Sequence, residues 1–88
     1  LGAVSGENVH ILELPIHQGS VCDGKRVKDI PWPENCLVVS LRKGMRVSIP
    51  HGTTRLSSGD ILVVVTERGV DPKVERLCAA EELESTPH

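Results

Sequence analysis

The feature that most constrains this chain is a strand that is apolar at every position and is entered through two tight turns. The strand spans residues 61–65, where the sequence Ile-Leu-Val-Val-Val has no polar side chain. Pro50 and Gly52 form a rigid turn ahead of it, and Gly59-Asp60 reverses the chain directly before it. Proline fixes φ, glycine permits left-handed backbone, and an aspartate in a turn can bond the backbone that follows it. Because strand side chains alternate between the two faces of a sheet, this strand requires apolar cover on both faces.

The rest of the pattern predicts an α+β domain in the order strand, helix, three strands, helix. Four segments have the apolar content and length of strands, namely residues 9–16, 36–41, 45–49 and 61–66. A tight hairpin is expected at residues 42–44. Two segments have helical spacing, residues 21–30 and a stretch that begins with Asp71 as N-cap and Pro72 as first helical residue.

The first strand and the sheet faces carry further expectations. Apolar alternation changes frame at Ile11-Leu12, which indicates either a bulge or a strand buried on both faces. Pro15 restricts the end of this strand to a sheet edge or a bulge. Two short helices can cover only one face of a sheet of about four strands, so we expect the other face to meet a second copy or a neighbouring domain.

Composition excludes several classes of protein. The 88 residues suit one small domain, for which we expect residues 9–80, with a linker or tail at 1–8 and a frayed tail at 81–88. The net charge is −2 with interspersed signs, so no basic face for nucleic acid is expected. The longest apolar run is far shorter than the ~20 residues of a membrane span. The chain starts at Leu1 rather than Met, and we expect it to be a piece of a longer protein.

Cysteines and histidines offer little chemistry. Cys22, Cys36 and Cys78 lie at wide, unrelated spacings, and no pairing of cysteine with histidine matches a zinc site. We expect reduced, mostly buried thiols, no metal, no cofactor and no catalytic residue. A small enzyme that uses a thiol or a histidine remains a remote alternative.

Trp32 is the only aromatic residue of the chain, and it stands between Pro31 and Pro33. The loop that holds it joins the first expected helix to the second strand. A single tryptophan can close the edge of a core, or it can form part of a contact surface, since tryptophan is enriched at interface hot spots. The sequence leaves both roles open.

The segment from Arg42 to Val65 resembles the second half of the TrkA-C (RCK C-terminal) domain. The residues that carry the likeness are Arg42, Gly44 and the pattern Pro50-x-Gly52-x-Thr54-x-Leu56-x-x-Gly59-Asp60. With the first strand, the approach at Gly24-Lys25 and the last helix, the likeness covers residues 9–77. It implies a non-catalytic, dimerising regulatory domain, cytoplasmic and attached to a membrane transport protein. The transport domain would lie on the same or a partner chain, and the ion would be potassium, another cation or chloride.

The resemblance also implies a small effector in a cleft between paired copies, which in several family members is cyclic di-AMP. The ligand there lies against positions that correspond to Ile30, Pro31, Trp32, Cys36 and Leu37. Nucleotide-binding members place an arginine after an Asp-Ile pair and an asparagine just ahead of the second strand. This chain keeps Asp29-Ile30 but has Pro31 and Leu37 at those points, so we expect cyclic di-AMP to bind weakly or not at all. A purely structural assembly domain without any ligand remains the alternative.

Overall fold

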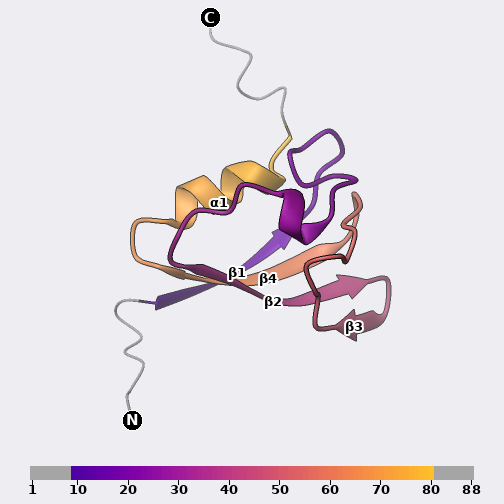
Figure 1. Cartoon of the computed structure of the whole chain (residues 1–88), viewed down its shortest axis with the longest axis horizontal. Helices are drawn as coiled ribbons and strands as arrows, with labels where there is room; N and C mark the ends of the chain where they lie inside the picture. Colours follow the sequence, from indigo (N-terminus) through magenta and orange to yellow (C-terminus); the bar gives the residue numbers. More distant parts are fainter. Residues whose placement is uncertain (1–8, 81–88) are drawn as a thin grey trace, which may run out of the picture.

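The computed structural model describes residues 9–80, which form a four-stranded sheet with one α-helix on one side (Figure 1). The elements are β1 (Val9–Pro15), the 3-10 helix η1 (Val27–Asp29), β2 (Cys36–Lys43), β3 (Arg46–Ser48), β4 (Ile61–Glu67) and α1 (Asp71–Cys78). The strand order is β1-β4-β2-β3, and every neighbouring pair is antiparallel. The expected α+β class and four strands are confirmed, whereas the expected tails at 1–8 and 81–88 lie outside the described residues.

The core forms where β4 meets the elements on the covered side of the sheet. β4 is bonded to β1 on one edge and to β2 on the other, and its Leu62 and Val64 side chains are completely buried. Val74 of α1 is equally buried. The other buried apolar residues come from strands, turns and the helix end, namely Leu14, Ile16, Cys22, Ile30, Leu41, Leu56 and Cys78. The narrow apolar stripe of α1 therefore packs onto the inner side chains of the sheet.

The opposite face of the sheet has no cover within residues 9–80. Figure 1 shows α1 and the segment with η1 on one side of the strands only. Ile11 of β1 is 71% exposed, and Leu37 of β2 and Val47 of β3 are each 64% exposed. The expectation that cover would lie mainly on one face is confirmed for this part of the chain.

The helix expected over residues 21–30 is wrong, because the backbone of this segment pairs with another part of the chain. Gly24 N–H donates to Leu56 O at 2.9 Å, and Val27 N–H donates to Thr54 O at 2.9 Å. Gly24 also has φ +81°, a left-handed conformation that interrupts a helix. Only Val27–Asp29 closes into a 3-10 turn, so the expectation of two helices is corrected to one α-helix and η1.

The strand boundaries agree with expectation at Pro15 and differ from it in β2 and β3. Pro15 lies in β1 at the sheet edge, as expected. The frame change at Ile11-Leu12 is no bulge, because the β1–β4 register has no shift, and the irregularity lies between Val38 and Ser40 of β2. β2 runs to Lys43, and β3 keeps only three of the five expected residues, all of them exposed.

The last helix begins one residue earlier than expected. Val70 is the N-cap, and Asp71 is the first helical residue. The Asp71 carboxylate does not cap the helix, because it accepts hydrogen bonds from Thr66 Oγ1 and His10 Nδ1 instead. No helix within residues 9–80 is long and apolar enough to span a membrane.

Replacing Gly24 tests the corrected structure of residues 21–30. A Cβ at Gly24 would meet no atom within 4 Å, so only the left-handed backbone opposes a side chain there. We expect Gly24→Ala to destabilise the domain by about 1 kcal/mol in urea unfolding, whereas the same change inside a helix would stabilise it. Gly52→Ala is the matched control, since its Cβ would make an ordinary 3.5 Å contact with Lys28. A stabilising Gly24→Ala would contradict the extended pairing.

Candidate functional site

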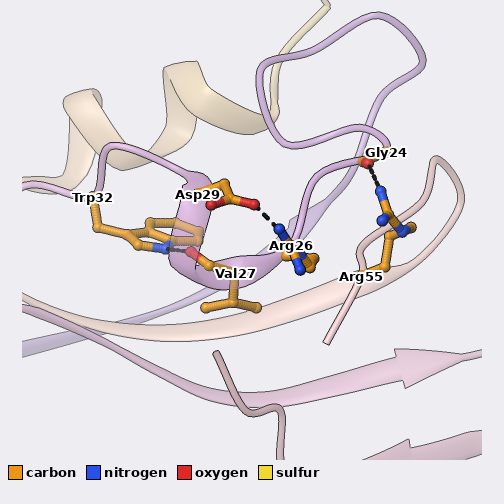
Figure 2. A network of polar contacts seen from close by, with 6 residues as sticks. All are labelled: Gly24, Arg26, Val27, Asp29, Trp32 and Arg55. Atoms are coloured by element: carbon orange, nitrogen blue, oxygen red, sulfur yellow. Dashed lines mark hydrogen bonds and ion pairs between the residues drawn. The ribbon is translucent and has the colours of Figure 1, made fainter. Parts of the chain in front are cut away.

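The loop after η1 is fixed by its own tryptophan. Trp32 Nε1–H donates to Val27 O at 3.0 Å, and Trp32 N–H donates to Ile30 O at 2.8 Å. The half-buried indole also packs against the core, and Figure 2 shows it lying alongside η1. Trp32 therefore closes the edge of the core and holds Pro31 and Pro33 on the outside of the loop.

Two arginines brace η1 from the other side. Arg26 Nε–H donates to Asp29 Oδ2 at 3.1 Å across the turn, and Arg55 Nη1–H donates to Gly24 O at 2.6 Å (Figure 2). The Arg55 contact joins the segment before η1 to the segment after β3. Both basic side chains thus serve the loop's conformation.

Among the described clefts of residues 9–80, none brings the five expected site residues together. Ile30 is buried in the core, Pro31 is exposed, and Leu37 is exposed on the opposite face of the sheet. Two shallow clefts flank the loop instead. The first, here called the helix cleft, has a volume of about 430 Å³ and is lined by Val21, Pro31, Pro33, Lys73, Arg76 and Leu77.

The second cleft, here called the strand-end cleft, lies where the N-terminal end of β2 meets the C-terminal end of β4. It has a volume of about 270 Å³ and is lined by Val9, Asn35, Cys36, Leu37, Val65, Thr66 and Glu67. Ile30 and Trp32 line neither cleft. Neither cleft therefore presents all five expected residues to a ligand.

Asn35 is a residue of this region that the sequence reasoning missed. It has φ 67°, and its carbonyl accepts the Glu67 N–H at 3.0 Å, so it starts β2 beside the end of β4. Asparagine adopts left-handed backbone more readily than most residues, which was the available signal. β2 starts at Cys36, so Leu37 lies within the strand and Asn35 stands directly ahead of it.

Cys36 is an unactivated thiol. Its Sγ–H donates to Pro33 O at 3.3 Å, and partial burial raises the pKa of Cys36 above the ordinary value. A thiol nucleophile needs the opposite shift, toward the thiolate. Asp60, the carboxylate next to the two serines of the turn, is held by Ser57 N–H at 3.0 Å and by Lys43 Nζ at 2.5 Å. Asp60 thus bonds backbone that precedes it rather than the following backbone expected from the sequence.

The uncovered side of the sheet, here called the open sheet face, is apolar across its strands. Ile11, Val65 and Leu37 lie opposite one another in the registers of β1, β4 and β2, so they form one row. Leu37 belongs both to this row and to the strand-end cleft. Two acidic residues and one basic residue share the face, since Glu13 pairs with Val63, Glu67 pairs with Val9, and Arg42 pairs with Ile61.

Within residues 9–80 no three His, Cys, Asp or Glu side chains are grouped so that they could hold a metal ion.

Comparison with known protein families identifies the family of this chain. A family model described as the TrkA-C domain matches residues 11–78, so this chain belongs to the TrkA-C domain family. The expected resemblance is thereby confirmed. Domains of this family are typically non-catalytic regulatory modules.

One sequence relative and one solved structure add detail. The Trk system potassium uptake protein TrkA homolog of Archaeoglobus fulgidus is 35% identical over 63 residues, which is 72% of this chain and 14% of that protein. The chain thus corresponds to a small part of that relative. A solved structure described as an RCK domain with cda has a TM-score of 0.67 at 17% identity, over 78% of this chain and 97% of that one. That likeness shows a shared fold.

The hydrogen bonds of Asp71 at the start of α1 predict how the stability of the domain changes at low pH. Hydrogen bonds from His10 and from Thr66, each 2.8 Å long, hold the pKa of the Asp71 carboxyl below its ordinary value of 3.8. The folded chain therefore binds a proton at Asp71 less readily than the unfolded chain does. The contribution of the Asp71 carboxylate to the free energy of unfolding is complete above pH 3.8 and disappears as pH falls through the lowered pKa. We expect Asp71→Asn to flatten the loss of stability below pH 4 in acid unfolding. Glu34→Gln, at an exposed position, should leave the acid profile unchanged, and an equal effect of both variants would refute the role of Asp71.

Proposed function

We propose that this chain is the dimerising regulatory domain of a potassium transport protein, cytoplasmic and attached to the membrane transport domain of the same or a partner chain. The family membership and the potassium uptake relative support the transport role. The observation that carries the dimer is the open sheet face. Exposed apolar surface of this extent in a small domain marks an interaction site.

A second copy suits the open sheet face better than an unrelated partner. In a two-fold dimer the same patch meets itself, so residue i of one copy contacts residue j of the other, and j contacts i. Glu67 lies on one side of the apolar row and Arg42 lies on the other, so a two-fold axis through the row can bring each of them near an opposite charge on the partner. Both the apolar row and the charges of this face can therefore pair with a second copy of the same face.

The proposed effector site comprises the region of Ile30, Pro31, Trp32, Cys36 and Leu37, of which only Leu37 lies on the open sheet face where the two copies would meet. Leu37 connects the open sheet face with the strand-end cleft, so the dimer would set this cleft against surface from the partner. Pro31 and Pro33 are held in position before binding by the Trp32 hydrogen bond, which lowers the ordering cost of a ligand contact. Lys73 and Arg76, on the far side of Pro31, would favour an effector that carries negative charge.

Placing a charge on the open sheet face tests the dimer. Leu37→Asp would bury a carboxylate in an apolar interface, and we expect the dimer to weaken about a hundredfold or more in sedimentation equilibrium. Lys28→Asp, at an exposed position on the covered side, adds the same group and should leave association unchanged. A wild-type chain that stays monomeric at several hundred micromolar would overturn the dimer.

Restoring the arginine of the nucleotide binders tests the effector site. The RCK domain with cda supports cyclic di-AMP as the first ligand to try. We expect the wild type to show little thermal shift with cyclic di-AMP, because Pro31 stands where the nucleotide binders have an arginine. The expectation that Leu37 takes the place of their asparagine is corrected, because Leu37 lies within β2 and Asn35 stands directly ahead of the strand. Pro31→Arg should therefore gain a shift, since ligand at one hundred times its Kd stabilises by about 2.7 kcal/mol.

The result also separates sensing from scaffolding. If Pro31→Arg binds cyclic di-AMP and the wild type does not, the proposed site is supported and the natural effector has another structure. If neither binds any nucleotide or anion in a thermal-shift screen, the chain is the purely structural dimerisation domain. Tight binding of cyclic di-AMP by the wild type would contradict the expectation drawn from Pro31.

A further inference from the structure

Two cysteines from distant parts of the sequence meet beneath the helix. Cys22 follows β1 in the turn of residues 21–24, and Cys78 is the last residue of α1. Their Sγ atoms are 3.6 Å apart, although the residues are 56 positions apart. Cys22 is completely buried and Cys78 is 2% exposed, and both are free thiols.

Backbone hydrogen bonds hold the turn of Cys22 and the segment after β1 against the end of α1. Cys22 N–H donates to Leu77 O at 3.1 Å, and His17 N–H donates to Cys78 O at 3.0 Å. These two bonds satisfy carbonyls at the C-terminal end of α1, which otherwise lack partners within the helix. A disulfide has a sulfur–sulfur distance of about 2.05 Å. The two sulfurs must therefore approach each other by about 1.5 Å for the bond to form.

We propose that Cys22 and Cys78 form a redox modification site, which a peroxide converts reversibly into a disulfide that fastens the end of α1 to the turn after β1. This inference is independent of the proposed effector and dimer. It assigns a function to two thiols that neither the open sheet face nor the clefts use.

The chemistry balances with hydrogen peroxide as the oxidant. One thiolate attacks a peroxide oxygen and becomes a sulfenic acid, and the oxygen that leaves takes up a proton to form water. The second sulfur then attacks the sulfenic sulfur, a second water leaves, and the disulfide forms. In total, two thiols and one peroxide give one disulfide and two waters. Dithiothreitol reverses the reaction by thiol–disulfide exchange.

The hydrogen bond between the two sulfurs lets one of them stay protonated while the other becomes the attacking thiolate, and either sulfur can be the donor. The sulfur that is not oxidised first then resolves the sulfenic acid. Since both are buried, peroxide reaches them when the short α1 helix opens at its end, so the reaction is gated by local unfolding.

Oxidation would act on the helix cleft. Leu77 and Val21, the neighbours of the two cysteines, both line that cleft. A covalent bond between Cys22 and Cys78 would hold these two walls together and remove the opening of α1. It also closes a long loop of the unfolded chain, so we expect a rise in Tm of about 10 °C or more.

The test compares two variants of the full chain, each with one cysteine replaced. Cys36→Ser leaves only the proposed pair, and peroxide should convert it to a monomer that has lost two hydrogen atoms by intact mass, with no free thiol and a raised Tm. Dithiothreitol should restore the original mass and Tm. Cys22→Ala is the matched variant, in which peroxide should produce no intramolecular disulfide and no rise in Tm.

Three results would overturn the inference. The first is that the Cys36→Ser variant still has two titratable thiols after a peroxide treatment that oxidises Cys36 in the wild-type chain. The second is a product in which two chains are linked, and the third is an oxidised monomer whose Tm is unchanged or lower. Alkylation of the Cys36→Ser variant provides an independent measure. In the reduced chain the two buried thiols should resist alkylation in the folded state and react in urea, whereas the oxidised chain should not react in either state.

Discussion

The structure depends on one constraint, which is that the central strand β4 is apolar on both faces while the described chain covers only one of them. Leu62 and Val64 point into the core, and Ile61, Val63 and Val65 point to the other side. α1 has eight residues and is the only α-helix within residues 9–80, so it cannot enclose the sheet. The uncovered apolar row and the proposed dimer both follow from this imbalance.

Much of the sheet could be predicted because its causes are local. The apolar runs that become β2 and β4 are bounded by turn residues, and the predicted strands begin at the observed residues. The turn at Gly59-Asp60 and the end of β1 at Pro15 likewise depend on the backbone preferences of single residues. The family likeness from Pro50 to Asp60 rests on the same turn residues.

The failures have non-local causes. Residues 21–30 have helical spacing, but Val27 and Lys28 donate to Thr54 and Gly52, partners that lie far along the chain. The meeting of Cys22 and Cys78 is hidden for the same reason, because their wide spacing indicates nothing until α1 folds onto the sheet. The five expected site residues are close in sequence, yet β2 carries Leu37 to the opposite face from Pro31.

The most direct test of the account is a methyl NMR experiment on a mixture of labelled and unlabelled chains. Intermolecular NOEs should arise from the methyl groups of Ile11, Val65 and Leu37, which form the apolar row of the open sheet face. Val74, buried beneath α1, should show none. Intermolecular NOEs confined to α1 and η1, or no intermolecular NOE at millimolar concentration, would contradict the claim that a second copy covers the sheet.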